Sequence, residues 1–139
     1  MVHALHEAWR ILVPQGILID LRPLCDDAPL EIVFTEGSES AGYVDMSPNI
    51  ADEIAADHAI DSVVREGIFM ELKAEYFDIA MYWNTVKDMN ADMDERWKDD
   101  VILREQVLRR AGTLFKKQRE KAPRVRLRHR ERLVTFEKW

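Results

Sequence analysis

The residue pattern best suited to chemistry is a run of arginines at every second position near the end of the chain. Arg124, Arg126, Arg128, Arg130 and Arg132 alternate with other residues, so a strand would place all five guanidinium groups on one face. Guanidinium groups bind phosphates, and they form paired hydrogen bonds with carboxylates. The run therefore marks an anion or partner contact. Its ligand is a carboxylate of the protein itself, a nucleic acid or a small anion.

The distribution of charge favours the first of these ligands. Residues 1–100 contain 7 Lys and Arg against 22 Asp and Glu, whereas residues 101–139 contain 13 against 4, which gives the net charge of −6. Such asymmetry is found in nucleic-acid-binding proteins, but it also lets two ends of one domain attract each other. Because acidic partners are abundant and net acidity opposes non-specific nucleic-acid binding, we expect internal or intersubunit pairing of the arginines.

Other reactive side chains have simpler structural explanations. His3, His6 and Glu7 share a helix and could approach a metal ion, but no third histidine or cysteine cluster stands near them in sequence. Cys25 is followed by the carboxylates of residues 26–27, which oppose formation of a nucleophilic thiolate. Four more polar residues fit the solvated face of a helix: Asp52, Glu53, Asp57 and His58. We therefore assign no catalytic, cofactor-binding or metal-binding residue.

The elements that must position these side chains predict an α+β fold, with helices packed on a mixed, mostly antiparallel sheet. Apolar spacing predicts a helix over residues 3–12, and the apolar run 17–23 predicts a strand buried on both faces. Residues 30–35 and 41–46 predict a hairpin joined by residues 36–40. A helix follows over residues 48–66 and ends at Gly67.

Two long alternating segments, 68–83 and 124–138, predict a pair of antiparallel strands. Both change the phase of their alternation midway, which a bend or bulge would explain. The register that aligns the two changes sets Met70 opposite Phe136 and Asp78 opposite Arg128. Between the two strands we expect one helix capped by Asn84 and another capped by Asp99 or Asp100.

The totals fit one domain over residues 1–139. The chain is 47% hydrophobic and 33% charged, within the range of globular proteins. Its single cysteine cannot form an intramolecular disulfide, which agrees with a reducing compartment. Charged residues interrupt every long apolar run, so we expect no signal peptide, no transmembrane helix and a cytoplasmic location.

The segment Glu7–Leu21, with the sequence EAWRILVPQGILIDL, resembles a stretch of class I S-adenosylmethionine-dependent methyltransferases. In that family a helix ending in Arg-hydrophobic-Leu leads through Pro-Gly-Gly into the fifth strand of the sheet, and Gln15 replaces the first of those glycines here. The match covers residues 4–23. The family finishes with a helix and an antiparallel strand pair, so the resemblance implies the C-terminal half of a Rossmann-like methyltransferase fold.

The cofactor-binding features of that family have no counterpart in this sequence. The family holds S-adenosylmethionine with a Gly-rich turn after its first strand and an acidic residue at the end of its second. The five glycines of this chain include no Gly-x-Gly cluster, so no position inherits those roles.

These observations predict a non-catalytic, methyltransferase-related interaction or regulatory module. A half-sheet exposes surfaces that the missing half would cover, so we expect self-association as a homodimer. One alternative is a methyltransferase-like subunit that needs another chain to bind S-adenosylmethionine. The other is a nucleic-acid-binding protein that uses the run from Arg124 to Arg132.

Overall fold

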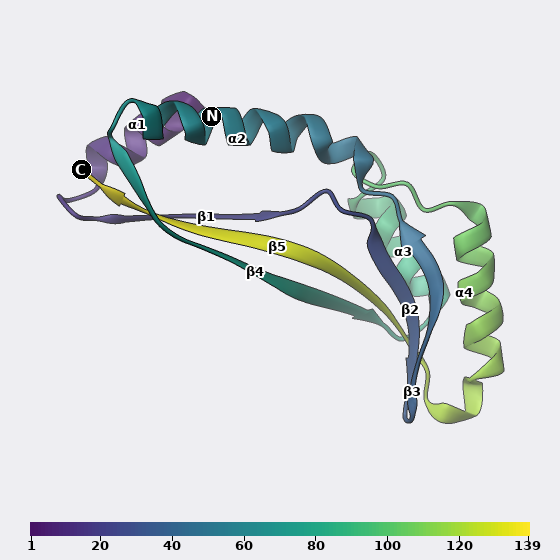
Figure 1. Ribbon diagram of the computed structural model, residues 1–139. Helices are drawn as coiled ribbons and strands as arrows, with labels where there is room; N and C mark the ends of the chain where they lie inside the picture. The colour runs from purple at the N-terminus through teal and green to yellow at the C-terminus, as the bar shows by residue number, and fades with distance from the viewer. The chain divides into compact units, whose positions relative to one another are not determined.

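The computed structural model describes all residues, 1–139, and confirms the predicted α+β class (Figure 1). Its α-helices and strands follow in the order α1 (Val2–Ile11), β1 (Ile17–Pro23), β2 (Ala28–Phe34), β3 (Gly37–Val44), α2 (Ile50–Arg65), β4 (Phe69–Trp83), α3 (Val86–Arg96), α4 (Glu105–Lys117) and β5 (Arg124–Lys138). The five-stranded sheet has the order β1-β5-β2-β3, and β4 also pairs with β5. The registered pairs β1–β5, β2–β3 and β2–β5 are all antiparallel.

The chain forms two compact units. Unit 1 comprises residues 1–24, 50–77 and 131–139, and unit 2 comprises residues 25–49 and 78–130. Each unit has its own cluster of buried apolar side chains. Strands β4 and β5 contribute residues to both units, whereas every helix belongs to one unit only.

In unit 1, α1 and α2 lie on the same side of the strands (Figure 1). Leu5 of α1 and Val63 of α2 pack with Phe69, Val134 and Phe136 of the strands. These positions follow from the helical spacing of apolar residues in each helix. The predicted stop of the second helix is confirmed, because the helix ends at Arg65 and Gly67 has a φ of 75°, which suits glycine.

The prediction that β1 is buried on both faces is wrong. Its register pairs Leu18 with Phe136 on the face that the helices cover, whereas Ile17, Ile19 and Leu21 point to the opposite face and are 46%, 60% and 52% exposed. The prediction relied on the apolar run alone. An unbroken run shows that a strand can be buried on both faces, but burial also needs a second layer, and unit 1 has helices on one side only.

The predicted register between the two long strands is also wrong in unit 1. Phe69, rather than Met70, is buried with Phe136, and the Trp139 amide donates a hydrogen bond to the Ile68 carbonyl at 3.2 Å. Because neighbouring side chains point to opposite faces of a strand, Met70 lies on the exposed face and cannot meet Phe136. The alternation of Ile68, Met70 and Leu72 is real, but Met70 and Leu72 are exposed, and only Ile68 packs against the buried cluster.

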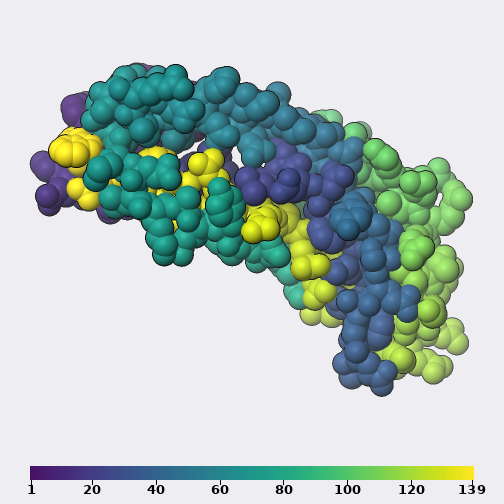
Figure 2. All heavy atoms as spheres, viewed as in Figure 1, coloured from purple at the N-terminus to yellow at the C-terminus, as the bar shows by residue number.

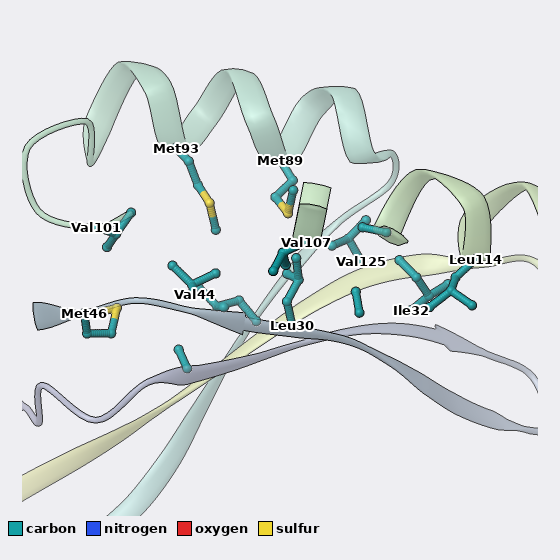
Figure 3. Packing of buried hydrophobic residues seen from close by; sticks show 14 residues of the cluster. Leu30, Ile32, Val44, Met46, Met89, Met93, Val101, Val107, Leu114 and Val125 are labelled. Atoms are coloured by element: carbon teal, nitrogen blue, oxygen red, sulfur yellow. The ribbon is translucent and has the colours of Figure 1, made fainter. Parts of the chain in front are cut away.

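Unit 2 is built on the predicted hairpin, whose strands are longer than expected and joined at Thr35 and Glu36. Apolar side chains from the hairpin, α3, α4 and β5 meet in one closely packed cluster (Figure 3). Leu30, Ile32, Val44, Met89 and Val125 are all fully buried within it. The alternation of buried residues along β2 places Leu30 and Ile32 on the face that contacts α4.

Both helix starts in unit 2 differ from the sequence prediction. The cap of α3 is Thr85 rather than Asn84, and its side chain accepts a hydrogen bond from the Asp88 amide at 3.0 Å. Helix α4 begins at Glu105, well after Asp99 and Asp100, and its cap residue makes no side-chain hydrogen bond. The intervening residues form instead an isolated bridge between Asp45 and Ile102. Capping rules consider only residues near the helix start, so they cannot predict such a long-range contact.

Candidate functional site

The arginine run lies along β5, and in unit 2 it surrounds one carboxylate of β2. Glu31 accepts hydrogen bonds from Arg126 Nε at 2.8 Å and from Arg128 Nε and Nη2 at 3.0 and 3.1 Å. The β2–β5 register places Glu31 directly opposite Arg126. The expected pairing of arginines with acidic residues from the first part of the chain is therefore confirmed for these two side chains.

The electrostatics of Glu31 follow from this geometry. Burial alone raises the pKa of Glu31, but the hydrogen bonds from Arg128 and Arg126 outweigh it, so its pKa lies below the ordinary value. The carboxylate therefore stays ionised and fixes two guanidinium groups at the sheet surface.

The run makes further contacts in unit 2. Arg124 stacks on the Tyr82 ring, with its guanidinium carbon 4.7 Å from the ring centroid. Arg128 Nη1 lies 3.8 Å from an Asp78 carboxylate oxygen, which confirms the predicted charge pair between the two long strands. Arg130 has an exposed side chain.

Arg132, the last member of the run, belongs to unit 1 and contributes to a separate ion cluster. Its Nη1 lies 3.2 Å from an Asp57 oxygen that also accepts a hydrogen bond from Arg22 Nη2 at 2.7 Å. Arg22 Nε donates to both oxygens of Asp20 at 2.9 Å. Asp20 of β1 and Asp57 of α2 therefore link β1, α2 and β5 through the guanidinium groups of Arg22 and Arg132.

The basic residues of α4 and the following turn are also matched with acids of unit 2. Lys117 lies 3.0 Å from Glu39, and Lys121 lies 3.1 Å from Glu36, both in the hairpin. The pKa of Glu39 is lowered, first by the hydrogen bond from Lys117. Basic residues from the last part of the chain are therefore paired with acidic residues from the first part within unit 2.

The other candidates for chemistry lie apart from one another. In unit 1, His6 Nε2 is 3.1 Å from Glu66, and Glu7 pairs with Arg10 at 2.9 Å. Cys25, in the segment of the chain that joins β1 to β2, is partly buried. His58 lines a shallow depression along α2, with Asp61, Ser62, Arg65 and Glu66. No group of three or more potential metal ligands is gathered anywhere in the chain.

The turn that carries the methyltransferase resemblance has a distinctive stereochemistry. Gln15, which occupies the place of the family's first glycine, has a φ of 63°. A side chain at Gly16 would lie 2.7 Å from the Val13 carbonyl oxygen, closer than atoms can pack. Both positions therefore favour glycine for physical reasons, one through its backbone angle and the other through close approach.

The sequence analysis expected uncovered surfaces on a half-sheet but did not place the one that lies in unit 1. We call it the open face, and it consists of Ile17, Ile19 and Leu21 of β1 and Met70 and Leu72 of β4. Their exposed fractions range from 37% to 60%. The alternation of apolar side chains in 68–72 was the available signal, but it does not tell which set is covered.

The strand edges beside the open face are uncovered as well. Strand β1 pairs only with β5, and β4 also pairs only with β5, so each has one free edge. None of the helices combines the length and apolar character that crossing a membrane requires. Comparisons with protein-family models, curated proteins and solved structures found no match for this chain. Its own geometry therefore carries the functional argument.

Proposed function

We propose that this chain is a methyltransferase-related interaction module that has no cofactor site of its own and self-associates. The observation that carries the proposal is the one-sided sheet of unit 1. Helices cover one face, while the open face and the free edges of β1 and β4 remain accessible. Contiguous apolar surface and free strand edges are typical of interaction sites.

The order of elements in unit 1 supports the relation to methyltransferases. A helix leads through the Val13–Gly16 turn into β1, and α2 and the strands β4 and β5 follow. This is the succession that the resemblance implies for the C-terminal half of that fold. The backbone of Gln15 and the crowding at Gly16 support the comparison further, since they explain why a Pro-Gly-Gly turn suits this place.

The absence of a Gly-rich turn supports a role in binding rather than catalysis. Such a turn lets the backbone approach a nucleotide-like ligand, and the residues of this chain supply none. We do not extend the proposal to nucleic acid, because Arg126, Arg128 and Arg132 are held by Glu31 and Asp57.

Light scattering and calorimetric titration test this proposal together. We expect a mass of twice the 16.3 kDa of the chain and no heat on titration with S-adenosylmethionine. A functional methyltransferase titrated in parallel is the positive control. A monomeric mass with no protein partner recovered would contradict the interaction module, and saturable cofactor binding would contradict the lack of a cofactor site.

A second candidate function is a methyltransferase subunit completed by another chain. The free edge of β1 favours it, because the strand that β1 resembles is the fifth of a larger sheet. The partner would supply the Gly-rich turn and continue the sheet from β1. This function requires that cofactor binding appears when such a partner is co-expressed with the chain. It is excluded if the co-purified complex gives no heat with S-adenosylmethionine.

A further inference from the structure

Strand β4 is a long edge strand whose middle is exposed on both faces. All side chains from Met70 to Phe77 are exposed, and the strand pairs only with β5. Strand β4 is the outer strand of the sheet in this part of the molecule (Figure 1). Its atoms lie at the surface in the space-filling view (Figure 2). An edge of this length offers a row of backbone donors and acceptors to another strand.

The centre of this exposed stretch, Leu72-Lys73-Ala74-Glu75-Tyr76, is complementary to itself in the antiparallel direction. We propose that β4 strands of two copies pair antiparallel about Ala74, so that the sheet continues across a two-fold axis. This inference rests on the proposed self-association and names the surface that performs it. Lys73 then lies opposite Glu75 of the partner subunit, and Leu72 lies opposite the partner's Tyr76. Each contact occurs twice because of the symmetry.

The charges select this register over its neighbours. With the axis at Lys73, that residue would face its own copy, and Glu71 would face the partner's Glu75. With the axis at Glu75, two carboxylates would face each other. Like charges directly opposite each other destabilise a strand pair, whereas opposite charges stabilise it. Only the axis at Ala74 joins both Lys73 and Glu75 to an opposite charge.

Lys73 and Glu75 lie at the surface, where they can meet the charges of a second chain. Lys73 Nζ and Glu75 Oε1 are 2.7 Å apart within the strand, and the two side chains remain 66% and 52% exposed. Such an exposed pair contributes little by itself and can exchange partners. The residue at the axis, Ala74, is small enough to lie beside its own copy. Tyr76 and Leu72, 52% and 47% exposed, would cover each other.

Charge reversal combined with mixing tests this arrangement on the full chain. Each of K73E and E75K places like charges in every central pair, so we expect the dimer dissociation constant to rise about tenfold or more. An equimolar mixture of the two variants joins two carboxylates to two ammonium groups, and dimers should return as mixed dimers. The variant K87E, which reverses an exposed charge on α3, is the matched control and should dimerise as the wild type does. Sedimentation velocity gives the masses, and circular dichroism verifies folding.

The outcomes separate this inference from the proposed function. A monomeric wild type overturns both. A wild-type dimer that K73E and E75K leave intact, or variants that the mixture fails to restore, overturns pairing about Ala74 while self-association stands. The mixture is decisive because a purely internal Lys73–Glu75 pair would not be repaired by a second chain.

A cysteine cross-link gives an independent measurement. Residues directly opposite in an antiparallel pair have Cα atoms about 4.5–5.5 Å apart, within the range a disulfide spans. In a C25S background, A74C should therefore give a covalent dimer on mild oxidation. The matched variant A80C, on the same exposed strand but away from the axis, should stay uncrosslinked. Equal cross-linking of both variants would overturn the register.

Discussion

Leu30 of unit 2 and Leu21 of unit 1 are both leucines in short strands that pair with β5, yet their surroundings differ completely. Leu30 is 0% exposed and lies among side chains of the hairpin, α3, α4 and β5. Leu21 is 52% exposed on the open face. A leucine in the same kind of strand is thus fully buried in unit 2 and about half exposed in unit 1.

The two carboxylates that each meet two arginines also differ in exposure. Glu31 of unit 2 has a 13% exposed side chain and accepts hydrogen bonds from two arginines of β5. Asp57 of unit 1 also meets two arginines, but its side chain is 40% exposed. The Asp20 side chain of unit 1, which pairs with Arg22, is also 13% exposed, so the units differ mainly in the open face of unit 1, which a second chain can cover. The contrast is the reason for placing the proposed interaction surface in unit 1.

The sharpest way to break this contrast is to shorten the two leucines. Leu30→Ala should lower the free energy of unfolding by about 2–5 kcal/mol, because it leaves a cavity in a closed cluster. Leu21→Ala should change it by about 1 kcal/mol or less, because about half of the side chain is already exposed. Denaturant unfolding at low protein concentration measures both. Equal costs would show that the open face is covered in solution.

The second comparison removes one charge from each ion cluster. Glu31→Gln should cost about 1–3 kcal/mol, since two shielded guanidinium groups lose a charged acceptor. Asp57→Asn should cost less than about 1 kcal/mol, since water screens its exposed carboxylate. Urea titration of both variants gives the difference. A larger loss for Asp57→Asn would place the more important cluster in unit 1.

The third and smallest effect concerns acid. Folding lowers the pKa of Glu31, so the stability it contributes is complete above its ordinary value of 4.5 and is lost as the pH falls through the lowered pKa. Glu31→Gln should therefore lose less stability than the wild type between about pH 7 and about pH 3. Unfolding measured at both pH values provides the test. Identical acid sensitivity would contradict a lowered pKa for this carboxyl.

Much of the fold could be predicted from local patterns. The strand Ile17–Pro23 has the predicted bounds, and the strand Arg124–Lys138 pairs with β4 as expected. The ion pair between Asp78 and Arg128 was also predicted. These features depend on residues close in sequence or on alternation along one strand. Both kinds of pattern can be identified in a single sequence. The predicted N-caps of α3 and α4 were wrong, because several polar residues near the start of each helix could act as the N-cap.

The candidate sites were predicted less completely. The arginine run indicated carboxylate partners, but not that Glu31 would hold two arginines in unit 2 while Asp57 holds Arg132 in unit 1. Uncovered surface was expected on a half-sheet, but the residues of the open face were not predicted. Identifying them requires knowing which side of the sheet α1 and α2 cover, and the apolar residues at 17–21 are compatible with either side.

The sequence by itself determined the element types, the antiparallel pairing of the long strands and the excess of acids available to the arginines. Hydrophobic periodicity and charge are local properties, so they can be predicted without coordinates. Only the tertiary structure decided that Phe69 rather than Met70 is buried, that β1 is covered on one face and that β4 has a free edge. Burial depends on which elements pack together, because a side chain is enclosed only when another layer lies over it.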